Sequence, residues 1–227
     1  MRAELQERRL EAAKCTKGTS SPTIYDLVLG AATRTIDTRG RLLEFGAGTG
    51  TLVRRLRAAG FMDITAADIL PKPADLDEVS WIEADLNEPL PARDAEYDAV
   101  VSTEVIEHLE NPRAVFRELG RVLRPGGHLL LTTPNQESVR SLLSLLVRGH
   151  HVDFLDGSYP AHITAILRTD LSRMCAESEF EPPVFFYTDV GSLPAAPRVT
   201  WQQVSAGLLR GRRFSDTLAM ATRKRSR

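Results

Sequence analysis

Short apolar runs alternate with helical stretches from about residue 41 onward. The runs have the length of buried parallel strands, and the stretches between them carry apolar residues at helical spacing. Strands that alternate with crossover helices predict a parallel sheet covered on both faces. We therefore predict an α/β fold with a single doubly wound, mostly parallel sheet. Its first strands centre on Leu42-Leu43, Ile64–Ala66, Trp81-Ile82, Ala99–Val101 and Leu129–Leu131.

Helix boundaries follow from capping and breaking residues. Ser21-Pro22 combines a capping hydroxyl with proline in the first turn, and Asn111-Pro112 repeats this arrangement. Gly60 ends the helix that follows the first strand. The charged opening stretch, up to about Lys17, is typical of a solvated helix or a mobile arm. We predict an N-terminal helical extension over residues 1–40 and a main domain over 41–227.

The C-terminal third continues the pattern less regularly. Val184–Tyr187 and Leu218–Ala221 predict two more strands. Between them we expect a loop over Gly191–Pro197 and a helix over Thr200–Leu209, which together form a late helical insertion.

Composition limits the class of protein. Hydrophobic residues make up 42% and charged residues 26% of 227 residues, which is ordinary for one globular domain. Cys15 and Cys175 have no zinc or disulfide spacing, which favours a reduced, cytoplasmic setting. No apolar run approaches the ~18 residues of a membrane span, and the charged N-terminus is not typical of a targeting peptide. The net charge of −1 does not favour nucleic acid as a partner.

A glycine-rich loop is the strongest local signal. Gly46, Gly48 and Gly50 lie between a predicted strand and a predicted helix, where a chain turns sharply and its backbone can approach a ligand. A tight turn without a ligand is the alternative. A dinucleotide fingerprint needs its third glycine one place later, since Thr51 stands at the sixth position from Gly46. A ligand without phosphate therefore fits this loop better.

Two acidic residues strengthen the prediction of a nucleoside ligand. Glu44 directly precedes the loop, where a carboxylate is costly unless it meets a cation or a donor. Asp68 ends the next strand at about the ~20-residue offset at which a carboxylate accepts from ribose hydroxyls. A cap or turn residue is the alternative for Asp68.

Together these motifs resemble the class I S-adenosylmethionine-dependent methyltransferases. The resemblance covers roughly residues 41–135 and extends to the late strands. It implies a Rossmann-like methyltransferase fold, S-adenosylmethionine as cofactor and S-adenosylhomocysteine as product. The residues that carry it are the glycine loop with Glu44, then Asp68, Ala84–Asn87, Tyr97–Val101 and Arg124–Gly127.

The resemblance also implies roles for individual residues. The loop, including Ala47, would line the methionine part of the cofactor, with Glu44 near its ammonium group. Asp68 would hold the ribose and Ile69 would pack beside the adenine. Asp85 would accept from the adenine amine near the Leu86 backbone. Thr103 and Glu104 would close the pocket near the sulfonium.

A second group of polar residues follows the fourth predicted strand. If a helix starts there, Glu104, Glu107 and His108 share one face at the carboxyl edge of the sheet. Two carboxylates and an imidazole can bind a divalent ion or act as base and orienting groups. The alternative is a capping Glu104 with the other two side chains in water.

This Glu-x-x-Glu-His pattern resembles two branches of the family. One is the ubiquinone-biosynthesis O-methyltransferase type with its small-molecule relatives. The other is the small-RNA 3′-terminal ribose methyltransferase type, in which such residues hold a metal with a distant histidine; His162 is the candidate here. The aromatic residues usual in that branch are replaced by Thr164 and Ile166.

The remaining features have two interpretations each. His150 and His151 are either surface residues or ligands. The basic C-terminal segments Arg210–Arg213 and Arg223–Arg225 either face solvent or hold an anion. The leucines of residues 142–147 belong to the core or face an apolar substrate. Residues 136–170 are predicted to form a substrate lid.

We predict an S-adenosylmethionine-dependent methyltransferase that acts on an oxygen of a small molecule such as a quinone precursor, a sugar or a natural product. The candidate catalytic residues are His108, Glu107 and Glu104, and the candidate metal ligands are Glu104, Glu107, His108 and His162. The alternatives are a metal-dependent RNA ribose methyltransferase, a nicotinamide-binding oxidoreductase and a non-catalytic cofactor-binding scaffold.

Overall fold

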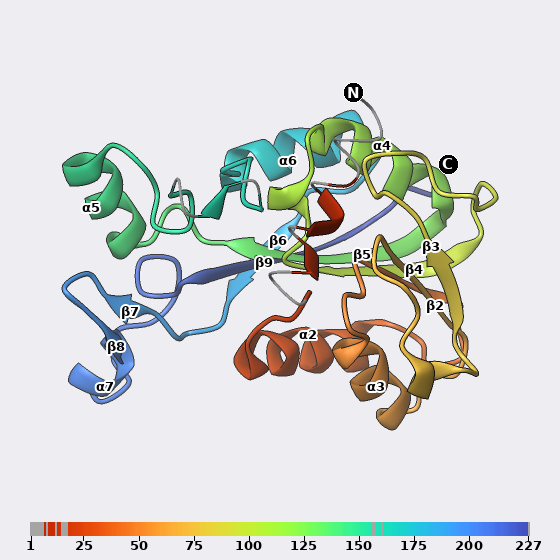
Figure 1. Ribbon diagram of the computed structural model, residues 1–227, viewed down its shortest axis with the longest axis horizontal. Coiled ribbons are helices and arrows are strands. Elements are labelled where there is room, and N and C mark those ends of the chain that lie inside the picture. Colours follow the sequence, from red (N-terminus) through yellow and green to blue (C-terminus); the bar gives the residue numbers. More distant parts are fainter. Residues whose placement is uncertain are drawn as a thin grey trace.

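A seven-stranded sheet forms the centre of the molecule (Figure 1). The structure is a computed structural model that describes residues 7, 9–11, 13–14, 18–155, 158–159 and 161–226. The strand order is β3-β2-β1-β4-β5-β9-β6, and all neighbours are parallel except β9, which runs antiparallel to β5 and β6. The strands are β1 (Leu42–Phe45), β2 (Ile64–Asp68), β3 (Ser80–Glu83), β4 (Tyr97–Thr103), β5 (Leu123–Pro134), β6 (Val184–Tyr187) and β9 (Thr217–Arg223).

Helices cover both faces of this sheet, as the alternating pattern predicted. In Figure 1, α2 (Pro22–Thr35) and α3 (Thr51–Ala58) lie on one side, and α4 (Pro112–Val122) and α6 (Arg168–Glu177) lie on the other. The helices on each side pack against the sheet through a separate hydrophobic cluster. Helix α5 (Val139–Arg148) projects from one end of the sheet.

Successive residues of a strand pack against helices on opposite faces of the sheet, because side chains alternate across a strand. Leu42 joins the cluster under α2 and α3, whereas Leu43 joins the cluster under α4. In β5, Leu130 belongs to the first cluster, and Leu129 and Leu131 belong to the second. The apolar runs are continuous because both faces are buried.

The predicted helix starts are confirmed. Ser21 is the N-cap of α2 and its side chain accepts from the Ile24 amide. Asn111 is the N-cap of α4, and its Oδ1 accepts from the Ala114 amide at 3.0 Å. Both caps satisfy amide groups that the first helical turn leaves unpaired.

The segment between the last two strands differs from the prediction. The expected loop over Gly191–Pro197 is wrong, because β7 (Ser192–Leu193) and β8 (Ala196–Thr200) pair as an antiparallel hairpin. The expected helix over Thr200–Leu209 is reduced to α7 (Trp201–Val204). The Thr200 hydroxyl caps this single turn, which ends at Ser205. The late insertion is therefore mainly a hairpin.

The strand order reverses direction between β1 and β4, which are neighbours in the sheet. From β1 the chain adds β2 and then β3 on one side of β1 in the sheet. It then returns to form β4 on the other side of β1. Ligands of doubly wound folds bind outside the carboxyl ends of the strands at such a point. The fold thus places the ends of β1, β2 and β4 around one expected site.

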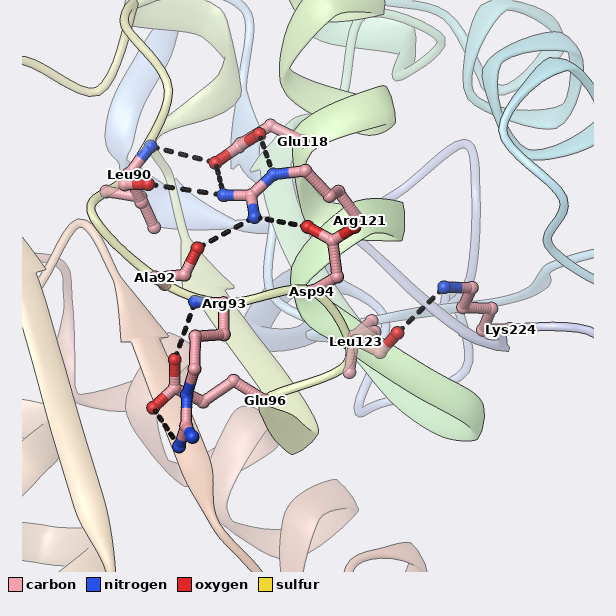
Figure 2. A network of polar contacts seen from close by, with 9 residues as sticks. All are labelled: Leu90, Ala92, Arg93, Asp94, Glu96, Glu118, Arg121, Leu123 and Lys224. Carbon is pink, nitrogen blue, oxygen red and sulfur yellow. Dashed lines mark hydrogen bonds and ion pairs between the residues drawn. The ribbon is translucent and has the colours of Figure 1, made fainter.

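A polar network at the opposite, amino edge of the sheet ties the β3–β4 connection to α4 (Figure 2). The Arg121 guanidinium donates to both oxygens of Glu118, to Asp94 and to the carbonyls of Leu90 and Ala92. Glu118 also accepts from the Leu90 amide at 2.8 Å. The carboxylates of Glu118 and Asp94 raise the pKa of Arg121 above its already high value.

We expect Arg121→Ala to lower the free energy of unfolding by about 1–2 kcal/mol, because two backbone carbonyls and two carboxylates lose a shared donor that is partly exposed. Urea denaturation of the ligand-free protein measures this. Arg93→Ala is the matched control, since its side chain is 77% exposed, and we expect a loss below about 0.5 kcal/mol. Equal stability of Arg121→Ala and wild type would contradict the prediction.

The structure also bears on the predicted absence of a membrane span and on the two cysteines. Within the described residues, no helix is long and apolar enough to cross a membrane. Cys175 is a free, buried thiol. Burial raises the pKa of this thiol to about 12, so it is unreactive. Cys15 lies outside the described residues.

Candidate active site

A cavity of about 290 Å³ opens at the carboxyl edge of the sheet, where the strand order predicted it. Its walls come from the segments after β1, β2, β3 and β4, from the N-terminal segment and from the loop before α6. Among the residues predicted for the site, the following line it: Gly46, Asp68, Ile69, Asp85, Leu86, Thr103, Glu104, His108 and His162.

The glycine loop packs too closely for side chains at two positions. Gly46 has a φ of +87°, and a Cβ there would lie 2.1 Å from Cγ2 of Val105. Gly48 has a φ of +53°, and a Cβ there would lie 1.8 Å from the carbonyl oxygen of Gly18. Ala47 is buried, and Gly50 is the N-cap of α3. Ala47, Gly48 and Gly50 therefore shape the loop without lining the cavity.

Asp68 joins the end of β2 to the glycine loop. Its Oδ2 accepts from the Gly48 amide at 2.7 Å, and its Oδ1 accepts from the Leu70 amide at 2.8 Å. Burial raises the pKa of this carboxyl, and the hydrogen bonds from Leu70 and Gly48 oppose that shift. The Ile69 amide also favours the charged form of Asp68 through a hydrogen bond. A carboxylate offers about four acceptor sites, so these backbone bonds do not use all of its capacity.

Glu44 is a buried carboxyl beside the loop. It is 3% exposed, and its Oε2 accepts no hydrogen bond from the described residues. Burial raises its pKa well above the usual value, and the neighbouring Asp68 charge adds to the shift. A neighbouring cation would favour the charged form of this carboxyl and oppose the effect of burial.

The other end of the cavity is formed after β3. Asp85 Oδ1 accepts from the backbone amide of Asn87 at 3.0 Å and from its side-chain amide at 2.9 Å. Leu86 is buried, and Ile69 follows Asp68 on the adjacent wall. This part of the cavity lining thus combines the carboxylate of Asp85 with the apolar side chains of Ile69 and Leu86. Such a lining suits a flat ring that has polar groups at its edge.

The segment after β4 is not the helix start that the spacing suggested. Glu104 has a φ of +51°, a left-handed conformation, and its amide donates to the carbonyl and hydroxyl oxygens of Thr132. Only the 3₁₀ turn η2 (Ile106–His108) follows. Glu104 and His108 nevertheless both line the cavity.

Glu107 is the most enclosed of these side chains, since it is fully buried. The Thr133 hydroxyl donates to its Oε2 at 3.0 Å, while Oε1 has no partner within the described part of the chain. Burial raises the pKa of both Glu107 and Glu104. The expectation that Glu107 and His108 face water is excluded.

His108 and His162 meet in the cavity wall, with ring centroids 4.8 Å apart. His108 Nδ1 donates to the Ala161 carbonyl and His162 Nδ1 donates to the Asp153 carbonyl, both at 2.7 Å. A carbonyl can only accept, so each Nδ1 carries the proton and each Nε2 is free of it in the neutral ring. Burial lowers the pKa of both, which favours this neutral form.

Glu107, His108 and His162 form a group that could hold a metal ion. Each offers one ligand atom, and these atoms lie within 4.8 Å of one another. An unpartnered carboxylate oxygen and two imidazole lone pairs are a donor set typical of transition metals. Glu104, the fourth predicted ligand, is not part of this group.

Other residues singled out from the sequence lie elsewhere. His150 and His151 do not line the cavity; His151 Nδ1 lies 2.8 Å from the Ser141 hydroxyl. Asp98 accepts from the Arg41 amide at 2.7 Å and pairs with Arg124 at the amino end of β4. Asp98 is therefore a structural residue at the start of a strand.

Several cavity residues were missed in the sequence. The largest group is N-terminal, where a charged stretch gave no sign of a ligand. Arg9, for which no local motif exists, pairs with Asp85 and with Glu110. The additional lining residues are Arg9, Ala13, Gly18, Thr19, Ser20, Leu70, Asn87, Val105, Leu109 and Ala161.

Comparison with known proteins identifies the family of this site. Residues 19–182 match the family model described as a methyltransferase domain. A ubiquinone biosynthesis O-methyltransferase of Xanthomonas oryzae pv. oryzae (strain PXO99A) is 30% identical over 148 residues, which are 56% of this chain and 60% of that protein. One from Dechloromonas aromatica (strain RCB) is 25% identical over 154 residues, 63% and 65% of the two chains. The match thus spans less than two thirds of these relatives.

Solved structures support the fold. A SAM-dependent methyltransferase of Thermotoga maritima, described as a possible histamine N-methyltransferase, has a TM-score of 0.64 at 15% identity and covers 98% of this chain and 96% of its own. A Burkholderia thailandensis 1,6-didemethyltoxoflavin-N1-methyltransferase, solved with S-adenosylhomocysteine, also scores 0.64 at 15% identity, covering 99% and 88%. A [4+2]-cyclase scores 0.58 at 21% identity, covering 89% and 80%.

The predicted fold and the predicted resemblance are both confirmed, because the strand order, the glycine loop and the family model agree. The predicted cofactor, S-adenosylmethionine, agrees with the names of the structural neighbours. The chain belongs to the methyltransferase domain family.

Proposed function

We propose that this protein transfers the methyl group of S-adenosylmethionine to an oxygen atom of a small hydroxylated molecule, with His108 as the general base. The observation that carries the proposal is the 2.7 Å contact between His108 Nδ1 and the Ala161 carbonyl, which leaves Nε2 as the basic atom, in the same cavity as Asp68 and Asp85. Relatives named ubiquinone biosynthesis O-methyltransferase support oxygen as the acceptor atom.

The cofactor would lie across the carboxyl ends of β1, β2 and β3. Asp68 lines the cavity, and the acceptor capacity that its backbone bonds leave unused suits the ribose hydroxyls. Ile69 and Leu86 would enclose the adenine, and Asp85 would accept from its amine. Glu44 would meet the ammonium group of the methionine part.

The acceptor would then lie near Thr103, Glu104 and His108. In the transfer, the acceptor oxygen forms a bond to the methyl carbon while the bond from that carbon to sulfur breaks. The hydroxyl proton passes to Nε2 of His108, and S-adenosylhomocysteine leaves as a neutral thioether. Most of the rate would come from alignment of the oxygen opposite sulfur in a cavity shielded from water. A base is needed because a neutral hydroxyl is a weak nucleophile.

Glu104 and Glu107 would assist from either side of His108. The positive charge moves from sulfur to the imidazole during the reaction. Glu104 in the cavity wall and the buried Glu107 next to His108 in the chain would stabilise a cation there when ionised. We retain residues 136–170 as a proposed substrate lid, because His162 extends from this segment into the cavity wall.

A divalent cation is a second candidate for activation of the acceptor. Glu107, His108 and His162 fit such an ion through the unpartnered Oε1 of Glu107 and one nitrogen of each imidazole. A bound cation would lower the pKa of an acceptor hydroxyl. His108 would then be a ligand in place of a base, so the two candidates exclude each other.

The test is radiolabelled methyl transfer to a panel of dihydroxybenzenes, hexoses and primary amines, before and after dialysis against a chelator. Transfer to a hydroxyl that survives chelation supports the His108 base. Loss that Mg²⁺, Mn²⁺ or Zn²⁺ restores supports the cation. Transfer to amines alone would contradict the assignment to oxygen. The [4+2]-cyclase among the structural neighbours makes this direct assay necessary, since fold does not decide chemistry.

We expect cofactor binding to release a proton from Glu44, because the ammonium group of the ligand favours the charged carboxylate. Burial and Asp68 raise the pKa of Glu44 in the free protein, and an ammonium group beside it would lower that pKa again. Calorimetry of S-adenosylhomocysteine binding in buffers of different ionisation enthalpy measures this release. We expect Glu44→Gln to abolish the dependence on buffer, and an unchanged dependence in that variant would contradict the assignment.

A further inference from the structure

The N-terminal segment forms one wall of the cavity. Arg9, Ala13 and the stretch from Gly18 to Ser20 all line it. Gly18 lies directly against the glycine loop, since a Cβ added to Gly18 would come within 2.5 Å of the Gly48 Cα. A molecule that fills the cavity therefore contacts this segment as well as the sheet edge.

Arg9 connects this wall to two loops of the main domain. Its guanidinium pairs with Asp85, after β3, and with Oε1 of Glu110, after η2, at 2.5 Å. The side chains of Arg9 and Asp85 are only 20% and 11% exposed, whereas Glu110 is 49% exposed. The pair with Asp85 is thus the better shielded one, and a shielded pair is less weakened by water and salt.

Asn87 joins the same two loops from within. Its side-chain amide donates to Asp85 Oδ1 at 2.9 Å, and its Oδ1 accepts from the Glu110 amide at 2.8 Å. Arg9, Asp85, Asn87 and Glu110 therefore form a closed ring of contacts, which we call the clasp. The clasp borders the cavity at Arg9, Asp85 and Asn87.

The clasp leaves room for one more donor on Asp85. Oδ1 accepts two hydrogen bonds from Asn87, and Oδ2 accepts from Arg9. A carboxylate has about four acceptor sites, so one site on Oδ2 remains. An adenine amine can use that site while Arg9 stays in place.

We propose that Arg9 is a positioning residue that retains the cofactor, because it fastens the N-terminal wall over the adenine end of the cavity through Asp85 and Glu110. This inference rests on the proposed function, since it takes the ligand to be S-adenosylmethionine with its adenine beside Asp85. Arg9 belongs to none of the sequence motifs described above, so the proposal adds a new residue to the cofactor site.

The test compares the binding of S-adenosylhomocysteine to wild type, Arg9→Ala and Arg9→Lys by calorimetry and by stopped-flow fluorescence. We expect Arg9→Ala to raise Kd about tenfold, mainly through faster dissociation, because loss of one shielded partner acts on the off-rate. Arg9→Lys keeps the charge but not the two-pronged geometry, so we expect a rise of about threefold. The KM for S-adenosylmethionine should follow Kd, and kcat at saturation should change less than twofold.

Two further variants separate retention from a general effect on folding. Arg57→Ala is the matched control, because it removes an exposed pair with Glu78 on α3, away from the cavity; it should bind like wild type. Glu110→Gln removes the other anchor and should raise the dissociation rate about threefold. In the double variant with Arg9→Ala the effects should not add. Glu110→Gln carries the test if Arg9→Ala does not fold.

Unchanged dissociation rates in Arg9→Ala and Glu110→Gln would overturn the proposal. Tighter binding in Arg9→Ala would also overturn it, because Arg9 would then compete with the nucleoside. Wild-type protein that binds no S-adenosylhomocysteine would remove both the proposed function and the clasp. Binding by wild type with no effect of Arg9 would remove the clasp alone.

Discussion

Replacement of His108 by alanine should lower kcat by about 10²–10⁴-fold, which is the usual contribution of a positioned general base. The same variant should bind S-adenosylhomocysteine within about twofold of wild type, because the cofactor contacts proposed above come from β1, β2 and β3. Its Nδ1 bond to Ala161 fixes the ring in the wall of the cavity, and burial keeps the ring neutral. The measurement is single-turnover methyl transfer with the acceptor that the panel identifies.

His150→Ala is the matched control for this experiment. His150 lies outside the cavity lining, and its Nδ1 contacts the backbone carbonyl of His151 at 3.0 Å. We expect wild-type rates for this control. Added imidazole should restore part of the rate of His108→Ala if the side chain acts as a base. Transfer at the wild-type rate without His108 would remove it from the mechanism.

Replacement of Asp68 by alanine should weaken cofactor binding about 100-fold or more. The change removes both proposed ribose contacts and also leaves the amides of Gly48 and Leu70 without their acceptor. A hydrogen bond to a charged group contributes about 1.5–3 kcal/mol, so loss of the ribose contacts accounts for the expected effect, because 1.4 kcal/mol corresponds to a factor of ten in affinity. Calorimetry with S-adenosylhomocysteine measures the loss.

Asp75→Asn is the control for Asp68. Asp75 is an exposed residue of the 3₁₀ turn η1 (Ala74–Leu76). It accepts a hydrogen bond from Arg54 of α3, and this bond lowers the pKa of Asp75. We expect no change in cofactor affinity there. Asp68→Asn should bind better than Asp68→Ala, because an amide oxygen can still accept from one of the two backbone groups. Equal affinity of wild type and Asp68→Ala would place the nucleoside elsewhere.

The two predictions probe different halves of the cavity. Asp68 belongs to the half formed by β1, β2 and β3, whose residue roles were inferred from the resemblance. His108 belongs to the half formed after β4 and by the loop before α6. The Asp68 result therefore tests the cofactor half of the proposal, and the His108 result tests the proposed base.

Much of the first half could be read from the sequence because its signals are local. The glycine loop follows β1, Asp68 ends β2 and Asp85 lies two residues after β3. Parallel strands end at one edge of the sheet, so the prediction of a parallel sheet was enough to bring these residues together. The helix caps Ser21 and Asn111 are equally local, and both were predicted correctly.

The second half could not be read in the same way. A helical face was expected to gather Glu104, Glu107 and His108, but Glu104 adopts a left-handed conformation and only one 3₁₀ turn follows. The hydrogen bond from the Glu104 amide to Thr132 belongs to the packing of β4 against β5. Local spacing contains no information about that contact.

The sequence by itself determined the doubly wound sheet, the position of the glycine loop and the carboxylates at the strand ends, since periodicity and turn residues act over a few positions. Only the tertiary structure decided that His108 bonds to Ala161, 53 positions away, and that Arg9 reaches Asp85, 76 positions away. Such contacts depend on how loops pack over a finished sheet. Their members carry no shared pattern, because the chain between them can take many paths before the core closes.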